Sequence, residues 1–580
     1  MLRTKILKNI VLVALAIIAV RLFFIQIIEH DHWVAKADEQ HTILETISAK
    51  RGEIYMVDKG EPVAVVLNQT MYQIIIDPAA VDKAAVKKAL EENVKDYLVV
   101  NLDEIFNQEG LRYSIVAKNV PRNNIEKLAA ENLSSVWFKK GNQRVYPEGE
   151  LGATTLGFVN ADGLGQYGVE GSLNEQLAGK DGLLKSTADF NKVALSIGND
   201  NIKIPAEDGK NIVLSIDRGL ERGTEELLQK HIDGTPATHA AALIMDPNTG
   251  EVITMASLPG YNPADYGKVE DASAYINQVT EVPYEPASVC KSFAFSAAIN
   301  EGKMTADTTY FNQGYEIVDG WKIQNAEQRA SIYGVINMKT ALYWSLNTGS
   351  IQALKLLGDN PNSITQQGRE RLYDYYHNKF RLGQATGIEL IEAEGFIPDP
   401  NEGWGRDSVY ANMTFGQNLG LTMIQTATAY SSVINGGTWH TPTVVKGYYE
   451  NGEIVPLGST SPVERISDKI LSDETSATMR DMFINNRSYK ARAGIDRAGY
   501  AIGGKSGTAQ VIKDGAYDDT MSETVGTYIG FVGPTNDLPK YVIMVKMWGE
   551  GHYLDGGIAS NLFDDLENYL IDYLKLKPGN

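Results

Sequence analysis

Ser288 and Lys291 are spaced for nucleophilic chemistry. They stand three residues apart in YEPASVCKSFAFSAAI, where Pro286 favours a helix start and the small apolar residues that follow favour a buried helix. Three residues make nearly one helical turn, so the amine would lie on the same face as the hydroxyl. A serine becomes a good nucleophile when a neighbour takes its proton, and burial near a positive helix end favours the neutral amine. The pair therefore predicts an activated serine.

A second candidate segment, GYAIGGKSGTAQ (residues 499–510), has two interpretations. Its G-x-x-x-x-G-K-S pattern fits a phosphate-binding loop, whereas K-S-G-T fits an edge strand that binds a carboxylate. A phosphate loop must lead into a helix, but the GTAQVI that follows predicts a strand, so we predict the edge strand. The dinucleotide-type pattern GLGQYG (163–168) lacks a buried strand before it and is a weak signal.

Ser345 and Asn347 form an S-x-N pattern in ALYWSLNTGS. Alone the pattern is uninformative, because helix caps and turns produce it often. Here it follows an apolar stretch and lies between S-x-x-K and K-S-G-T. We therefore expect positions 288, 345 and 505 to converge on one cleft.

Composition limits the classes of function. The chain has 580 residues, 43% of them hydrophobic and 22% charged, which is ordinary for a globular protein of several domains. Its net charge of −20 makes nucleic acid an improbable partner. Cys290 is the only cysteine, which excludes an intramolecular disulfide and a thiolate metal site, and we expect it to pack in the core.

The N-terminus predicts a membrane anchor. Residues 10–28 are almost entirely apolar and long enough to span a bilayer. Basic residues precede this segment and acidic residues follow it, which predicts a single span with a cytoplasmic N-terminus and an extracytoplasmic remainder. A cleavable signal peptide is the alternative, but the apolar run continues beyond the small residues that would precede a cleavage site.

The remaining chain predicts an α/β (α+β) fold in two further domains. We expect an anchor at 1–29, a mixed domain at 30–205 that ends near a linker at 203–211, and a C-terminal domain at 206–580. In the mixed domain a strand is expected at 71–78 and a helix at 81–98, with Asp77 and Pro78 as its start.

In the C-terminal domain, strands at both ends and helices between them predict one sheet with helices on its faces. The expected elements are strands at 211–217 and within 239–257, helices at 291–302 and 421–437, strands at 500–512, 524–533 and 540–548, and a helix at 561–576.

These motifs together resemble class B penicillin-binding proteins, membrane-anchored peptidoglycan D,D-transpeptidases with an antiparallel catalytic sheet flanked by helices. The likeness extends to AKRGEIY, RVYPEGELGATTLGFV, GQYGVEGSLNEQLAGKDG, IMDPNTGEVITMASLPGYNP and FGQNLGLTMIQTATAYSSVINGG. Ala287 and Ser292 stand where the family usually has Gly and Pro, and MVDKGEP replaces its D-R-N-G element. In this family the mixed domain expected at 30–205 would be the pedestal that carries the catalytic domain. We see no glycosyltransferase region between the anchor and this pedestal, which argues against a bifunctional class A enzyme.

The resemblance implies catalytic roles. Ser288 would attack the penultimate D-Ala carbonyl of a stem pentapeptide and form an acyl-enzyme, with Lys291 as general base. Ser345 would pass a proton to the leaving D-alanine, and Asn347 would orient Lys291 and the peptide amide. No metal or cofactor is implied.

It also implies a substrate-binding strand. Lys505, Ser506 and Thr508 would bind the terminal carboxylate, and Gly507 would let the peptide approach the backbone. The backbone N–H groups of Ser288 and Thr508 would form the oxyanion hole.

The implied partners are peptidoglycan stem peptides, β-lactam antibiotics and, through the pedestal, a SEDS-family glycan polymerase with division or elongation proteins. Two alternatives are a hydrolase, either a D,D-carboxypeptidase or a β-lactamase, and a non-catalytic penicillin-binding sensor. The intact Ser288, Lys291 and Lys505 argue against the sensor.

Overall fold

A computed structural model of the chain describes residues 2–33, 36, 42–187, 202–457, 463–489, 496–513, 516–517 and 520–579. The chain divides into two compact units, residues 1–52 with 178–210 and residues 53–177 with 211–580. Residues of the expected domain 30–205 belong to both units. The domain boundaries at 30 and 206 therefore stay predictions.

The first unit contains the apolar segment. α1 (Leu2–Phe23) continues into η1 (Phe24–Ile28), and this helix of 27 residues is long and apolar enough to cross a membrane. It includes the expected span at 10–28 and begins earlier, in the basic N-terminal residues. An antiparallel sheet in the order β1-β8-β9 also belongs to this unit. Its strands are β1 (Thr42–Ile47), β8 (Gly182–Thr187) and β9 (Ile202–Ile204). Because β9 reaches Ile204, the expected linker at 203–211 is wrong for its first residues.

In the second unit, one sheet joins segments that are far apart in the sequence. Its order is β19-β18-β10-β2-β3-β4, with β5 also paired to β3. The pairing of β2 with β10 is parallel, and β18 pairs with β10 in the antiparallel sense. β3 confirms the strand expected at 71–78 and extends it towards the N-terminus. The strands are β2 (Ile54–Asp58), β3 (Glu61–Ile76), β4 (Ser114–Pro121), β5 (Val136–Val145), β10 (Ile212–Asp217), β18 (Val445–Glu450) and β19 (Glu453–Pro456).

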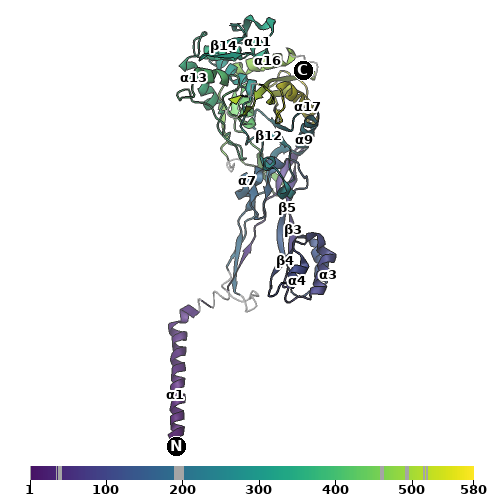
Figure 1. Cartoon of the computed structure of the whole chain (residues 1–580), viewed down its shortest axis with the longest axis vertical. Coiled ribbons are helices and arrows are strands. Elements are labelled where there is room, and N and C mark those ends of the chain that lie inside the picture. The colour runs from purple at the N-terminus through teal and green to yellow at the C-terminus, as the bar shows by residue number, and fades with distance from the viewer. Residues whose placement is uncertain are drawn as a thin grey trace. The chain divides into compact units, whose positions relative to one another are not determined.

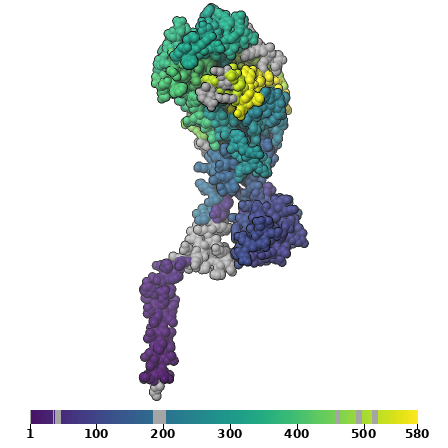
Figure 2. Space-filling view, viewed as in Figure 1, coloured from purple at the N-terminus to yellow at the C-terminus, as the bar shows by residue number. Residues whose placement is uncertain are grey.

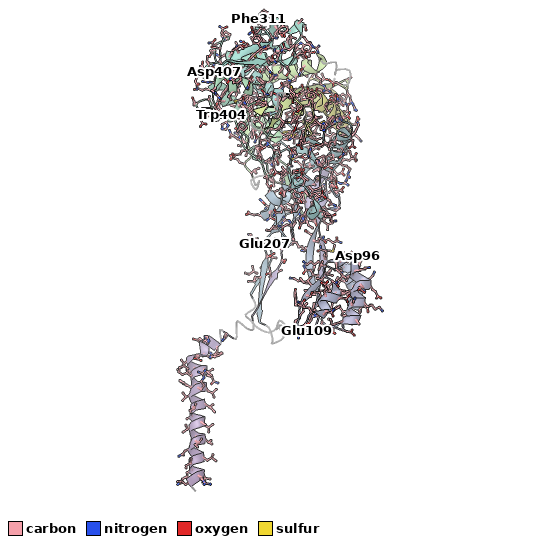
Figure 3. All side chains as sticks on the ribbon, in the orientation of Figure 1. Asp96, Glu109, Glu207, Phe311, Trp404 and Asp407 are labelled. Carbon is pink, nitrogen blue, oxygen red and sulfur yellow. The ribbon has the colours of Figure 1, made fainter. Side chains whose placement is uncertain are left out.

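Helices packed on β3 and β4 form a lobe with its own apolar core, drawn in indigo in Figure 2. They are α3 (Lys83–Val94), η2 (Lys95–Tyr97), α4 (Leu102–Asn107) and α5 (Arg122–Ala130). The helix expected at 81–98 is present, but its start signal is wrong. Asp82 is the N-cap and accepts from the backbone N–H groups of Ala84 and Ala85. Acidic side chains such as Asp96 and Glu109 lie exposed on this lobe (Figure 3).

Short elements follow the lobe: α6 (Ala153–Leu156), β6 (Phe158–Val159), β7 (Gly165–Gln166), α7 (Gly168–Ser172) and α8 (Asn174–Ala178). β6 and β7 pair as an antiparallel hairpin. The GLGQYG segment at 163–168 therefore contains a short hairpin strand and does not follow a buried strand of a parallel sheet, which a dinucleotide site requires.

The central sheet of the C-terminal region is antiparallel in the order β12-β11-β25-β24-β21. Its strands are β11 (His239–Met245), β12 (Val252–Leu258), β21 (Tyr500–Gln510), β24 (Thr524–Pro534) and β25 (Tyr541–Trp548), and they confirm the expected strands. α9 (Arg218–Asp233) and α17 (Gly556–Leu574) pack side by side on one face (Figure 1). The other face packs against α15 (Met423–Ile434) and α16 (Asp473–Tyr489), so helices cover both faces. α10 (Lys291–Asn300) and α12 (Asn347–Leu357) belong to the same apolar core.

The remaining elements surround this core. The helices are η3 (Pro263–Lys268), η4 (Ala272–Tyr275), η5 (Ala287–Cys290), η6 (Ala330–Ile332), α11 (Met338–Tyr343), α13 (Gln366–Tyr373), η7 (Asp374–Lys379), α14 (Asp407–Met413) and α16 (Asp473–Tyr489). The strands are β13 (Thr309–Asn312), β14 (Tyr315–Val318), β15 (Trp321–Gln324), β16 (Gly334–Asn337), β17 (Thr438–His440), β20 (Ser467–Lys469), β22 (Ile512–Lys513) and β23 (Ala516–Tyr517).

One buried and one partly buried carboxyl group on α9 bind backbone N–H groups of neighbouring segments. Glu221 accepts from the backbone N–H of Met255 at 2.9 Å, and Glu225 accepts from that of Gly152 at 2.8 Å. Burial raises the pKa of both side chains well above the ordinary value of a glutamate. The fold therefore favours their protonated forms.

Candidate active site

Ser288 lies in the tight turn η5, which leads directly into α10. A 3-10 turn has three residues per turn, so residues i and i+3 eclipse each other. This places Lys291 Nζ 2.8 Å from Ser288 Oγ. The sequence predicted that Ser288 lies in the first turn of the helix itself, whereas the turn precedes α10. Cys290 is fully buried in the apolar core, which confirms its expected packing role.

The backbone before the serine is strained. Ala287 has φ +50°, a conformation that favours glycine, and glycine is the residue that the resemblance leads one to expect at this position. Gly416 faces the same residue, because a Cβ on Gly416 would lie 2.0 Å from Ala287 O. A close backbone contact therefore supports the turn that presents Ser288.

Ser345 and Asn347 reach the amine of Lys291 from the junction between α11 and α12. Lys291 Nζ donates to Ser345 O at 2.7 Å and to Asn347 Oδ1 at 2.8 Å, and lies 3.2 Å from Ser345 Oγ. Ser345 has φ +57°, which turns the chain between the two helices. Asn347 Nδ2 donates to Gln324 O at 2.9 Å and so fixes the direction of Oδ1.

These contacts define what the amine can do. The carbonyl oxygens of Ser345 and Asn347 can only accept hydrogen bonds, so each takes one N–H of Lys291. A neutral amine then has its lone pair left for the hydroxyl proton of Ser288. The lysine is fully buried, which disfavours its charged form. The geometry fits a general base beside a nucleophile.

Lys505 approaches from β21, the edge strand of the central sheet among the described residues. Its Nζ donates to Ser345 Oγ at 2.9 Å and to Ser506 O at 2.9 Å. Ser345 Oγ therefore links the amines of Lys291 and Lys505, and a second cation nearby further favours a neutral Lys291. Residues 500–510 form a strand rather than a loop before a helix, as the edge-strand interpretation predicted.

Gly507 and Thr508 border the turn that carries Ser288. A Cβ on Gly507 would lie 2.5 Å from Pro286 O, so only glycine permits this approach of β21 to η5. Thr508 Oγ1 accepts from the backbone N–H of Gly556 at 3.0 Å, which leaves its hydroxyl proton to donate elsewhere. Ser506 is partly exposed beside it. The expected carboxylate-binding residues thus lie along one strand next to Ser288.

Sequence analysis missed three neighbours of this site. Gln324 supplies the carbonyl that orients Asn347, and Phe415 places its ring centroid 5.8 Å from Lys291 Nζ. Gln417 bonds Gln510 at 3.2 Å and so connects the Phe415 loop to the end of β21. The FGQ segment (residues 415–417) is a sequence signal that could have indicated Phe415 and Gln417. Gln324 contributes only its backbone carbonyl, which no side-chain motif can reveal.

Comparisons with known proteins agree with this geometry. The family described as penicillin binding protein transpeptidase domain matches residues 240–567, more than half of the chain, and includes the positions of all three motifs. The chain belongs to the penicillin-binding protein transpeptidases. The penicillin-binding protein dimerisation domain matches residues 46–214. As the resemblance indicated, the chain is of the class B type.

Individual relatives cover most of the chain. Penicillin-binding protein PbpB of Mycolicibacterium smegmatis is 30% identical over 478 residues, 77% of this chain and 67% of that protein. Peptidoglycan D,D-transpeptidase FtsI of Escherichia coli is 25% identical over 594 residues, 99% of this chain and 92% of that protein. Among solved structures, penicillin-binding protein 2X of Streptococcus thermophilus has a TM-score of 0.72 at 21% identity and covers 92% of this chain and 81% of its own, which supports the fold.

Proposed function

We propose that this chain crosslinks peptidoglycan as a serine-type D,D-transpeptidase, with Ser288 as the nucleophile. Ser288 Oγ attacks the penultimate D-Ala carbonyl of a stem pentapeptide, and its proton passes to Lys291. The bond to the terminal D-alanine breaks, and that amine receives a proton through Ser345. An amine from a neighbouring stem then attacks the acyl-enzyme and releases the serine. The same serine is expected to be acylated by β-lactams.

The observation that carries the proposal is the continuous hydrogen-bonded chain from the nucleophile to the edge strand. It runs from Ser288 Oγ through Lys291 Nζ and Ser345 Oγ to Lys505 Nζ, with distances of 2.8, 3.2 and 2.9 Å. Proton transfer requires such hydrogen-bond reach. Asn347 holds Lys291, and Lys505 supplies charge for a substrate carboxylate. The same strand offers Ser506 and Thr508 for that carboxylate.

The oxyanion hole in this proposal consists of the backbone N–H groups of Ser288 and Thr508. Ser288 lies near the start of η5, where backbone donors have no partner within the turn, and Thr508 lies on the adjacent edge strand. Loss of one such donor typically lowers a rate by about 10²–10³-fold.

The location of the enzyme follows from the anchor. The helix at residues 2–28 and the family indicate a membrane-anchored protein. In our proposal its N-terminus is cytoplasmic and residues 30–205 form a pedestal for an extracytoplasmic transpeptidase domain at 206–580, supported by the charge pattern and the matched ranges. The pedestal would bind a SEDS-family glycan polymerase with division or elongation proteins. Their failure to co-purify from membranes would count against that partnership.

Fluorescent penicillin labelling tests the nucleophile. Ser288→Ala should abolish labelling, whereas Ser292→Ala should retain it. Ser292 is a matched control because it is a buried serine on the adjoining helix whose Oγ has no hydrogen-bond partner among the described residues. Absent labelling of the wild type would favour a non-catalytic protein that retains the fold without acylation of its serine. Labelling that survives in Ser288→Ala would reject the assigned nucleophile.

An acceptor assay separates crosslinking from hydrolysis. The full-length protein is incubated with a peptide ending in D-Ala-D-Ala, with and without an amine acceptor, and the products are resolved by mass. A transpeptidase should form the amide with the acceptor. Hydrolysed product alone, at every acceptor concentration, would favour a carboxypeptidase.

A further inference from the structure

A small cavity of about 190 Å³ lies at one end of the central sheet, and its lining includes none of the serine-site residues described above. It lies where β12 and β25 end and β11 begins, beneath the segment that carries η4. Its walls include His239, Ser257, Gln278 and Trp548, together with apolar groups such as Leu258 and Ile276. A cavity of this size exceeds the roughly 30 Å³ share of a single water.

The register of the sheet explains the space. Ala241 pairs with Ser257 on one side and with Lys546 on the other, so the three side chains lie in a row on one face. The central member of the row is small, and Lys546 Nζ contacts two residues of the cavity wall, Gln278 and Trp548. His239 and Trp548 are paired one step further along, and their stacked rings, 5.1 Å apart, close one side of the cavity.

Lys546 is buried without an anionic partner. Lys546 is only 3% exposed, and no carboxylate of the described residues forms an ion pair with its amine. Its Nζ lies 3.2 Å from Gln278 Oε1 and over the rings of Trp548 and Tyr284, at 4.3 and 4.8 Å from their centroids. An ammonium group has three donors, and burying one without an anion is costly.

A second polar group in the cavity also lacks a partner. Ser257 Oγ lines the cavity and is buried, and it makes no hydrogen bond within the described part of the chain. A buried hydroxyl without a partner is destabilising, because it has lost its hydrogen bonds to water. A hydroxyl donor in the cavity wall and a cation against that wall suit a monoanion with two oxygen acceptors.

We propose that this cavity binds the carboxylate of a small molecule, of the size of acetate or a single amino acid. One carboxylate oxygen would pair with Lys546 and the other would accept from Ser257. The apolar walls would contact a short aliphatic group.

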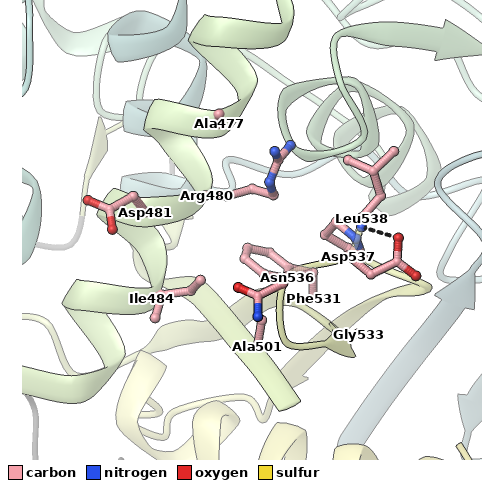
Figure 4. Close-up of a pocket in the computed structure, with 11 residues that line it drawn as sticks. Ala477, Arg480, Asp481, Ile484, Ala501, Phe531, Gly533, Asn536, Asp537 and Leu538 are labelled. Carbon is pink, nitrogen blue, oxygen red and sulfur yellow. Dashed lines mark hydrogen bonds between the residues drawn. The ribbon is translucent and has the colours of Figure 1, made fainter. Parts of the chain in front are cut away.

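A larger cavity of about 460 Å³ beside α16 offers no comparable site (Figure 4). Its cation, Arg480, already donates to Ile434 O and Ser476 Oγ, and two of its lining residues, Asp481 and Asp537, are acidic.

The proposed site has a defined pH dependence. Burial lowers the pKa of Lys546 to about 7, so its charge is lost as the pH rises through that value. Burial also lowers the pKa of His239, whereas hydrogen bonding to Ser273 lowers that of Asp271 and burial raises that of Tyr284. Between about pH 6 and pH 8, Lys546 is therefore the group whose charge changes most. Carboxylate affinity should fall about tenfold over this interval, in proportion to the charged fraction.

Isothermal titration of the full-length protein in detergent, with acetate as the probe, tests the site. We expect binding at about pH 6 that weakens about tenfold at pH 8. At the lower pH, Lys546→Met should weaken the affinity for acetate by at least about tenfold, and Ser257→Ala should weaken it by about threefold. Lys546→Arg, whose charge is permanent, should retain binding and lose the pH dependence. A parallel titration with D-alanine distinguishes a simple anion site from an amino-acid site.

Two results would overturn the proposal. One is no binding by the wild type up to about 0.1 M acetate. The other is unchanged affinity in Lys546→Met. Circular dichroism checks that Lys546→Met folds. If it does not fold, Lys546→Arg is compared with the wild type instead. Equal pH dependence of acetate binding in these two proteins would exclude Lys546 as the binding group.

Discussion

Replacing Asn347 by aspartate would test whether Lys291 works as a neutral base. The new carboxylate would lie where Oδ1 now accepts from Lys291 Nζ at 2.8 Å. An opposite charge at this range raises the pKa of an amine by about 1–3, which makes the neutral base up to about 10–1000-fold rarer at a fixed pH. The second carboxylate oxygen would face Gln324 O, which now accepts from Nδ2. This repulsion would also disturb the orientation of the side chain.

We expect acylation by fluorescent penicillin, followed by stopped-flow or gel, to slow by about 100-fold at neutral pH. The rate should recover about tenfold per pH unit as the pH rises, because deprotonation restores the base. Asn347→Ala removes the acceptor without adding charge, so it should slow acylation without this recovery. A rate for Asn347→Asp within about threefold of the wild type, or a loss that higher pH does not reverse, would refute a neutral Lys291.

Three further changes have expected outcomes. Glu221→Gln should raise the melting temperature relative to the wild type increasingly as pH rises above the ordinary glutamate pKa, because burial raises the folded-state pKa and ionisation destabilises the fold. Gly507→Ala should slow acylation by at least about tenfold, since its Cβ would lie 2.5 Å from Pro286 O and displace β21. Arg144→Met should lower the free energy of unfolding by about 3–5 kcal/mol in denaturant titrations, because it breaks the buried ion pair with Glu170.

Each change has its own check. A constant effect of Glu221→Gln across pH 5 to 8.5, about the range where its carboxyl group would ionise, would contradict the burial argument. Gly403→Ala is the control for Gly507→Ala, because a Cβ there meets no atom within 4 Å, and equal rates in both variants would contradict the close approach of β21. Wild-type stability in Arg144→Met would show that the ion pair does not stabilise the fold.

Local patterns predicted the elements of the catalytic region well. β-branched runs such as those of β24 and β25 form strands, and the small apolar run after Ser288 forms α10, because these segments are buried on the faces that their composition indicates. The parallel pairing of β2 with β10 could not be predicted in this way. It joins segments that are distant in the sequence and depends on tertiary packing rather than on any local period.

The site shows the same division. The order of the three motifs predicted which side chains would meet, and the structure brings Ser288, Lys291, Ser345 and Lys505 together. The sequence did not indicate the 3-10 geometry of η5 or the backbone carbonyl of Gln324. Both depend on backbone conformation set by surrounding contacts, which side-chain types do not encode.

Mass spectrometry of the full-length protein after brief reaction with benzylpenicillin tests the central claim most directly. The account predicts one added antibiotic per chain, mapped by proteolysis to the peptide that contains Ser288 and lost in Lys291→Met. Modification of a different residue, or full acylation of Lys291→Met at the wild-type rate, would contradict it.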